Sequence, residues 1–151
     1  MKKSKLVMVG NGMAGVRTLE ELLKIAPEFY DITVFGAEPH PNYNRILLSP
    51  VLAGEQTLEE IVLNDWSWYT DHGITLHAGY KVTEVDRIKR IVHAVGPDGE
   101  QVSAEYDRLI MATGSNPFIL PIPGKDLEGV LAYRDIADTQ AMIDAAAQYK
   151  H

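Results

Sequence analysis

Cysteine is absent from this sequence of 151 residues. Without a thiol, the chain has no disulfide framework, no thiolate metal site and no Cys-x-x-Cys redox pair of its own. The histidines are scattered without the spacing of metal ligands, so we predict no metal site. Long apolar runs are also missing, since no stretch approaches the roughly 18 residues that a membrane-spanning helix needs.

Positive charge is scarce as well. The 14 Lys and Arg residues face 21 Asp and Glu residues, and the net charge of −7 argues against nucleic acid as a partner. The basic start of the chain is followed by a short apolar stretch that runs into glycines, too short for a signal peptide. We therefore expect a cytoplasmic protein that does not bind membranes, with room for one domain and its core.

Glycine, by contrast, is concentrated near the start. Gly10-Asn11-Gly12-Met13-Ala14-Gly15 follows the apolar run 6–9 and precedes a helical pattern over residues 13–26. A G-x-G-x-x-G motif between a strand and a helix indicates a dinucleotide site, with a glycine-rich turn that binds nothing as the alternative. Gly10 allows the tight turn, Gly12 lets a pyrophosphate approach the backbone, and Gly15 lets the helix pack closely. The helix N-terminus then faces the phosphates.

An acidic residue follows at the distance that such a site requires. A second strand, predicted over residues 31–35, completes a β-α-β unit with two parallel strands. Glu38 lies about 20 residues beyond the glycines, where a carboxylate accepts hydrogen bonds from ribose hydroxyls. A solvated loop carboxylate is the alternative. Arg45 lies in the proline-rich segment 39–50, predicted to be neither helix nor strand, and faces either a phosphate or cofactor ring or solvent.

The rest of the chain alternates helical and strand patterns. Thr57 and Glu60 have the spacing of a capping box that opens a short helix. Asn64 or Asp65 is expected to cap a helix over residues 66–72. Further strands are predicted over 74–77, 81–86, 90–95, 101–106 and 108–112, and a last helix over 135–148. The fold class is thus α/β, with a Rossmann-like β-α-β unit, a parallel sheet and an inserted antiparallel β-meander.

Several of these pieces occur in the order of a known family. The glycine motif, Glu38, the loop Tyr43-Asn44-Arg45 to Leu48-Ser49, the meander and the run Tyr106 to Gly114 resemble the FAD-binding domain of the two-dinucleotide-binding flavoprotein disulfide-reductase superfamily. Within it, Gly-Asn-Gly-Met-Ala-Gly, Ile-Thr-Val-Phe and Leu-Ile-Met-Ala-Thr-Gly-Ser-x-Pro are most similar to the N-terminal region of the NAD(P)H-dependent nitrite reductase large subunits. The resemblance covers essentially the whole chain, as an incomplete FAD/NAD(P)-binding fold.

The resemblance implies a role for each matching residue. Gly10, Gly12 and Gly15, with Met13 and Ala14 between them, would receive the FAD pyrophosphate, and Glu38 the adenosine ribose. Arg45 would face the flavin or its phosphates, with Ser49 supporting the same loop. Val82 would contact adenine through its backbone, and Ala112, Thr113 and Gly114 would approach FAD from the other side. No residue is expected to be catalytic. Ala37 stands where some relatives carry their acidic residue, and Pro50 where many carry a lysine near the flavin.

The resemblance also implies an activity and a domain plan. Residues 1–134 would form a partial FAD-binding domain, and residues 135–151 a crossover helix leading to an NAD(P)H-binding domain absent from this chain. In nitrate assimilation, electrons would pass from NAD(P)H through FAD to a siroheme and iron–sulfur module of the same polypeptide, which reduces nitrite to ammonia. Alone, the chain would bind FAD weakly, show no turnover and self-associate through an exposed apolar face.

Two other functions fit the same residues. A ferredoxin or rubredoxin reductase-type flavoprotein would lack a siroheme module, and a stand-alone nucleotide-binding module would transfer no electrons. A second glycine motif and paired cysteines beyond His151 would favour the nitrite reductase family.

Overall fold

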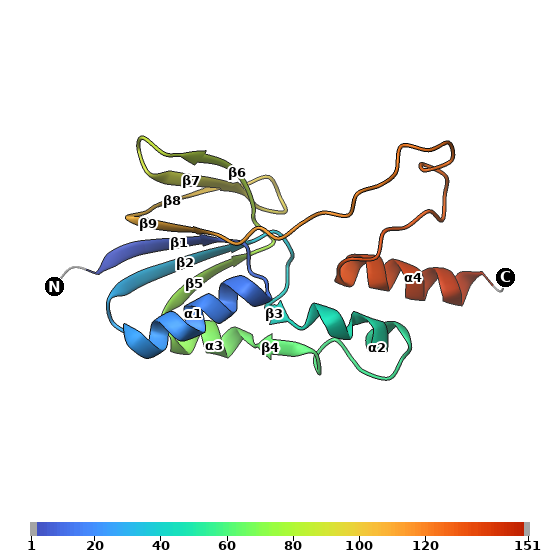
Figure 1. Cartoon of the computed structure of the whole chain (residues 1–151), viewed down its shortest axis with the longest axis horizontal. Coiled ribbons are helices and arrows are strands. Elements are labelled where there is room, and N and C mark those ends of the chain that lie inside the picture. Colours follow the sequence, from blue (N-terminus) through green and yellow to red (C-terminus); the bar gives the residue numbers. More distant parts are fainter. Residues whose placement is uncertain (1–2, 150–151) are drawn as a thin grey trace. The chain divides into compact units, whose positions relative to one another are not determined.

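A parallel sheet forms the centre of the first part of the chain. In the computed structural model, which describes residues 3–149, four strands lie in the order β5-β2-β1-β9 (Figure 1). They are β1 (Ser4–Val9), β2 (Tyr30–Gly36), β5 (Ile74–Ala78) and β9 (Arg108–Met111). Strand β1 pairs in parallel with both β2 and β9. The α/β fold class and the parallel β-α-β unit predicted from the sequence are confirmed.

The two faces of this sheet are covered by different elements. Leu6 and Met8 of β1 pack in a core with α1 (Met13–Ile25) and α3 (Trp66–Asp71). Val7 and Val9, which alternate with them, pack in a second core with the meander. Successive side chains of a strand point to opposite faces, and both faces of β1 are covered by a core. The sequence of β1 is therefore continuously apolar from Leu6 to Val9.

The meander consists of three antiparallel strands. They are β6 (Lys81–Asp86), β7 (Ile91–Val95) and β8 (Gln101–Glu105), in the order β6-β7-β8. The pairing of β6 with β7 shifts register between Val82 and Glu84. The turn predicted between β7 and β8 closes through a hydrogen bond from the Gly96 N–H to the Glu100 carbonyl, 2.8 Å long. The meander predicted from the alternating pattern is therefore confirmed.

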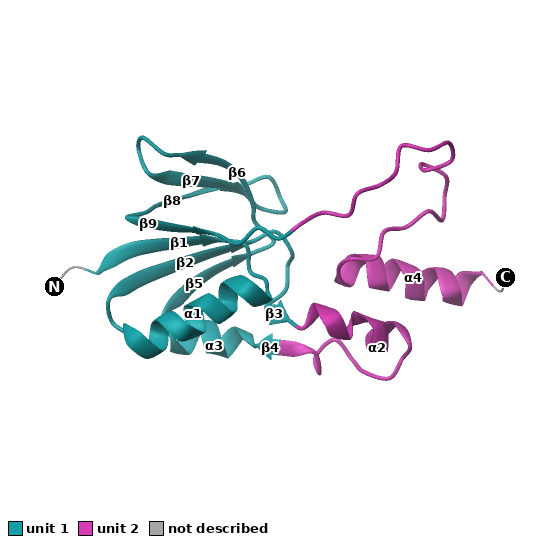
Figure 2. Ribbon diagram, viewed as in Figure 1, with its two compact units in different colours: residues 1–43, 63–114 teal, residues 44–62, 115–151 magenta. Residues whose placement is uncertain are grey.

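Contacts divide the described residues into two units (Figure 2). The first comprises residues 3–43 and 63–114, and the second comprises residues 44–62 and 115–149. The second unit contains η1 (Arg45–Leu47), α2 (Leu48–Leu52) and α4 (Ile136–Gln148), and α2 packs against α4. Asp135 and Asp138 cap α4 reciprocally, as a capping box does. The short strands β3 (Asn42–Tyr43) and β4 (Val62–Asn64) pair with each other.

Two local predictions are wrong. Residues 39–50 were expected to form neither helix nor strand, yet β3, η1 and the start of α2 lie there. Asn44 caps η1 by accepting a hydrogen bond from the Ile46 N–H, 3.1 Å long. Pro50 lies in the first turn of α2, where a missing N–H breaks no helical hydrogen bond.

The second wrong prediction concerns Thr57 and Glu60. Their reciprocal hydrogen bonds are present, at 2.7 and 3.3 Å, but they enclose only a turn instead of opening a helix. The chain then enters β4, and sheet pairing replaces further helical turns. Asp65 caps α3 as expected, through the Trp68 N–H at 2.9 Å.

Residues 3–149 include no helix that is both long and apolar enough to cross a membrane. The first two residues of the basic N-terminal stretch, and the last two of the predicted segment 135–151, lie outside the described residues.

Candidate functional site

The first glycine of the motif is required by the protein's own backbone. Its N–H donates to the Phe35 carbonyl of β2 at 2.8 Å, and the Ala112 N–H donates to the Val9 carbonyl at 2.8 Å. These bonds bring the carboxyl ends of β1, β2 and β9 together around Gly10. Its φ of +105° lies in a region that side chains disfavour. A Cβ at this position would be 2.0 Å from the Ala112 carbonyl oxygen.

Gly15 is required by packing. A Cβ there would lie 3.0 Å from the Met8 sulfur and 3.0 Å from the Ala112 Cβ. The absent side chain therefore lets α1 approach β1 and the end of β9 closely. Such an approach places the N-terminus of α1 at the carboxyl edge of the sheet, where open α/β sheets bind their ligands.

Gly12 has no comparable reason to be glycine. Its φ of −93° and ψ of 177° are extended values open to any residue, and a Cβ would meet no atom within 4 Å. Gly12 is the N-cap of α1, where no side chain makes a capping hydrogen bond and the first turn contains no acidic residue. Open space thus adjoins N–H groups at the positive end of a helix dipole, which fits a phosphate.

Glu38 lies two residues beyond β2 with its carboxylate held by a tyrosine. The Tyr43 hydroxyl donates to Oε2 of Glu38 at 2.6 Å, and the Glu38 carbonyl accepts from the Gly79 N–H at 2.9 Å. Tyr43 is buried and Glu38 is half-buried. The carboxylate is therefore fixed near the carboxyl ends of β2 and β5 and is not a mobile surface charge.

The other predicted site residues fall in different surroundings. Met13 and Ala14 form the first turn of α1, and the exposed Thr113 and Gly114 follow β9 directly after Ala112. Val82 lies on β6, opposite Ala94, and its side chain packs against the second core.

Arg45 and Ser49 belong to the second unit. There Nη1 of Arg45 donates to the Arg134 carbonyl at 2.9 Å, and the Ser49 hydroxyl lies 3.0 Å from the Tyr133 hydroxyl. Both side chains thus contact the segment that leads into α4.

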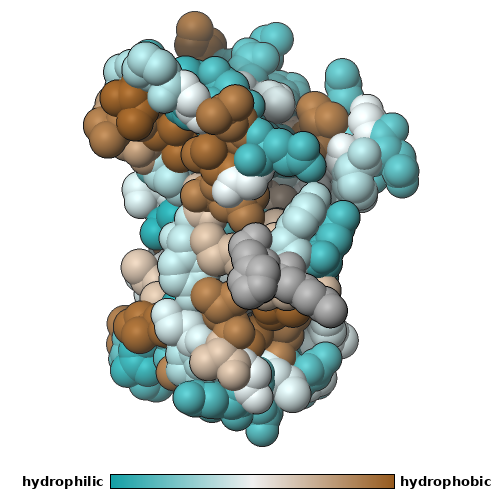
Figure 3. Space-filling model, turned by 90° about the vertical axis from the view of Figure 1, so that its right-hand side faces the viewer, coloured by the Kyte–Doolittle hydropathy of each residue, from teal (hydrophilic) through white to brown (hydrophobic). Residues whose placement is uncertain are grey.

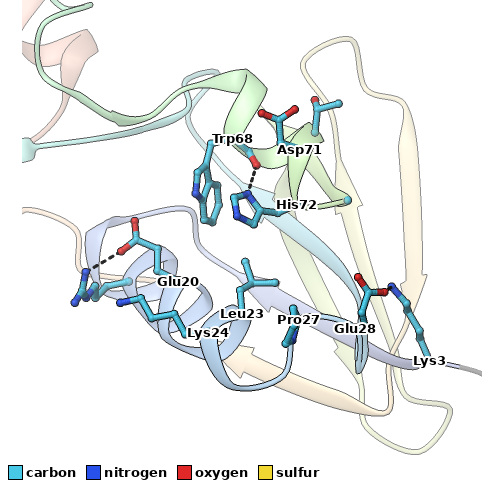
Figure 4. Close-up of a pocket in the computed structure, with 12 residues that line it drawn as sticks. Lys3, Glu20, Leu23, Lys24, Pro27, Glu28, Trp68, Asp71 and His72 are labelled. Carbon is cyan, nitrogen blue, oxygen red and sulfur yellow. Dashed lines mark hydrogen bonds and ion pairs between the residues drawn. The ribbon is translucent and has the colours of Figure 1, made fainter.

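A groove of about 770 Å³ lies elsewhere on the first unit (Figure 4). Its lining includes Glu20, Leu23 and Lys24 of α1. Trp68 of α3 and His72, the C-cap of α3, also line it. Lys3, Glu28 and Gly73, which precede the strands β1, β2 and β5, also line it. The groove therefore lies at the amino ends of the strands, whereas the glycine motif lies at their carboxyl ends, and we assign no cofactor to it.

Several residues around the glycine motif were not predicted. Tyr69 donates a hydrogen bond to Asn11, the second residue of the motif, although 58 positions separate them. An asparagine inside an otherwise apolar motif was the one available signal, and no local pattern pointed to its partner. His77 is half-buried and stacked on Phe35, with ring centroids 4.9 Å apart, and its burial lowers its pKa.

Comparison with known proteins agrees with this geometry. The NAD(P)H nitrite reductase of Bacillus subtilis is 54% identical over 150 residues, which are 99% of this chain and 18% of that protein. The assimilatory nitrate reductase electron transfer subunit of the same organism is 49% identical, over 99% of this chain and 19% of its own length. The chain thus spans about a fifth of these relatives.

A solved structure supports the fold. The water-forming NADH oxidase from Lactobacillus brevis, bound to NADH, superimposes with a TM-score of 0.86 at 22% identity, covering 97% of this chain and 33% of that one. A family model for pyridine nucleotide-disulphide oxidoreductases matches residues 4–150. Since this match takes in nearly every residue, the chain belongs to the pyridine nucleotide-disulphide oxidoreductase family.

Proposed function

We propose that this chain binds FAD through its glycine motif, as part of an NAD(P)H-dependent oxidoreductase of the nitrite reductase type. One observation carries the proposal. Gly12 is a glycine that neither backbone conformation nor packing requires, at an uncapped helix N-terminus. The close approach of a dinucleotide pyrophosphate to the backbone supplies a reason for glycine at this position.

In this proposal, each part of the chain has a binding role. The backbone N–H groups at the start of α1 donate to the pyrophosphate, which the helix dipole also attracts. Glu38, oriented by Tyr43, accepts from the ribose hydroxyls of the adenosine. The remaining assignments are those that the family resemblance implies, namely Gly10, Met13, Ala14, Gly15, Arg45, Ser49, Val82, Ala112, Thr113 and Gly114.

FAD, when bound, would accept a hydride from NAD(P)H and pass on the electrons one at a time, while the protein binds and orients the cofactor. We further propose that the acceptor is a siroheme and iron–sulfur module outside these 151 residues, which reduces nitrite to ammonia. The 54% identity with the Bacillus subtilis nitrite reductase supports this acceptor. Residues 1–134 would form the FAD-binding part, and α4, within residues 135–151, would lead to an NAD(P)H-binding domain.

A second candidate differs only in the acceptor. The 49% identity with an assimilatory nitrate reductase electron transfer subunit favours a flavoprotein that delivers its electrons to a separate protein. The glycine motif and Glu38 would have the same binding roles in both cases.

Titration of the purified chain with FAD tests the binding role. We expect saturable but weak binding by calorimetry, accompanied by a change in flavin fluorescence, and no turnover of NAD(P)H. NADH and ATP, titrated in parallel, should bind more weakly than FAD. A folded chain that binds no FAD, or that prefers NADH or ATP, would contradict the proposal.

Exposed apolar side chains in the second unit predict self-association. Apolar surface interrupts the polar surface on the face seen in Figure 3. The large exposed apolar side chains of the second unit include Phe118, Ile119, Leu120, Ile122, Leu127, Val130 and Leu131. Because water disfavours such a concentration of apolar surface, we expect sedimentation velocity to detect dimers or larger species. Replacing Phe118 and Ile122 with serine should shift the distribution toward monomer, whereas Ile88→Ser, an isolated exposed residue in the first unit, should not. A monomeric wild-type chain would refute the prediction.

A further inference from the structure

The buried phenol of Tyr69 contacts Asn11, in the loop that carries the glycine motif between β1 and α1. The Tyr69 hydroxyl of α3 donates to Oδ1 of Asn11 at 2.7 Å and accepts from the Asn42 N–H at 3.2 Å. Tyr69 is only 2% exposed. Burial raises its pKa, so the phenol keeps its proton and remains a hydrogen-bond donor.

Asn11 is held by the protein through its whole side chain. Its Nδ2 donates to the His40 carbonyl at 3.3 Å, while its Oδ1 accepts from Tyr69. Its Cβ lies so close to Gly36 that a Cβ on Gly36 would be 2.8 Å away. Both polar atoms of the amide are therefore engaged within the first unit. The side chain acts as an anchor for the backbone between Gly10 and Gly12, while the loop backbone is the part available to a phosphate.

The same network reaches α1 at a second point. Nδ2 of Asn42 donates to Oδ1 of Asn64 at 2.8 Å, and Nδ2 of Asn64 donates to Oε1 of Glu20 at 2.9 Å. Glu20 lies on α1 and also accepts from Arg17 at 3.0 Å. Asn42 and Asn64 are buried, where unpaired amide atoms are costly. Both nitrogens and the Asn64 oxygen are hydrogen-bonded, whereas Oδ1 of Asn42 has no hydrogen-bond partner among the described residues. The network thus connects the β1–α1 loop and the middle of α1 to β3, β4 and α3.

We propose that Tyr69 is a positioning residue for the cofactor, which acts through Asn11 to hold the glycine motif in its phosphate-binding conformation. The inference rests on the proposed FAD-binding function. Binding is tighter when the backbone donors are ordered beforehand, because less freedom is lost when the ligand arrives. The two glycines that flank Asn11 have no side chains of their own, so the loop is held by their backbone hydrogen bonds and by the side chain of Asn11.

Tyr69→Phe tests the proposal, with Tyr80→Phe as a control that removes an exposed phenol hydrogen bond from the same unit. Each variant removes one phenol hydroxyl from the first unit. The Tyr80 hydroxyl donates to Oε1 of Glu100 at 2.8 Å, next to the meander. We expect Tyr69→Phe to weaken FAD binding about tenfold, and Tyr80→Phe to leave the Kd unchanged. Asn11→Ala should weaken binding similarly, and the double variant with Tyr69→Phe should be little worse than either single one.

Hydrogen exchange in the chain without FAD gives an independent readout. The Gly10 and Val16 amides are hydrogen-bonded to Phe35 and Gly12. In Tyr69→Phe we expect these two amides to exchange several-fold faster than in the wild-type chain. The amides of the meander strands β7 and β8 serve as the internal reference, and their exchange rates should change less. If Tyr69 has a purely structural role, Tyr69→Phe will lower the unfolding temperature without changing the Kd or the exchange of these two amides. That result would overturn the proposal.

The two proposals fail in different ways. If the wild-type chain is folded and binds no FAD, the proposed function fails, and the exchange rates at Gly10 and Val16 still decide whether Tyr69 holds the loop. If Gly12→Val abolishes FAD binding while Tyr69→Phe binds as tightly as wild type, the function stands and the positioning role is wrong.

Discussion

Gly12→Val will abolish measurable FAD binding and leave the chain folded, with only a small loss of stability. Valine fits the extended φ and ψ of Gly12, and a Cβ there meets no protein atom within 4 Å. The branched side chain would instead occupy the space beside the first turn of α1. If two hydrogen bonds from N–H groups to a charged phosphate are lost, the affinity falls by about 100-fold or more.

Calorimetry with FAD, and urea unfolding of the same samples, measure the two halves of this prediction. The free energy of unfolding should fall by no more than about 1 kcal/mol, the cost of placing valine at the N-cap of α1. Gly54→Val is a control for the binding half alone, because Gly54 has open space around it and belongs to the second unit. Its φ of +74° strains a valine, so this variant should lose stability and keep its affinity for FAD. Undiminished FAD binding by Gly12→Val would remove the main support for the proposed site.

Gly10→Ala will destabilise the chain by about 4 kcal/mol or more. Two costs add at this position. Alanine disfavours a φ of +105°, and its Cβ would lie 2.0 Å from the Ala112 carbonyl oxygen, so the end of β9 must move. That movement also disturbs the hydrogen bond from the Ala112 N–H to Val9, which joins β9 to β1.

Gly99→Ala separates these two costs. Gly99 has a φ of +82° but open space around it, so alanine there should cost only about 1–2 kcal/mol, from the backbone alone. Urea unfolding of both variants measures the difference, which reports the clash with Ala112. Equal destabilisation by the two substitutions would show that β9 does not restrict the residue at position 10.

The sequence predicted the elements of the first unit well because their signals are local. The apolar run before Gly10, the alternation in the meander and the capping side chain of Asp65 each act over a few residues. The predictions failed where the same local sequence signal is compatible with two structures, a turn or the start of a helix. The Thr57–Glu60 bonds form, but tertiary pairing of β3 with β4 ends the turn before a helix develops.

The candidate site was predicted unevenly for the same reason. The glycine motif and Glu38 follow a fixed spacing along the chain, so they could be identified without a structure. The pairs Tyr43–Glu38 and Tyr69–Asn11 follow no spacing rule, because these contacts depend on how α3 packs against β5 and β3 against α1. The ligand roles of all the predicted site residues, the glycine motif and Glu38 included, stay predictions.

By itself, the sequence determined the α/β class, the parallel β-α-β unit, the meander and the position of the dinucleotide motif. Hydrophobic period, turn residues and helix caps specify these features through neighbours in the chain. Only the tertiary structure decided which glycines the protein itself needs and which leaves space for a ligand. That distinction depends on Ala112, about a hundred residues after Gly10, and on the empty space at Gly12, and both arise only when distant strands pack together.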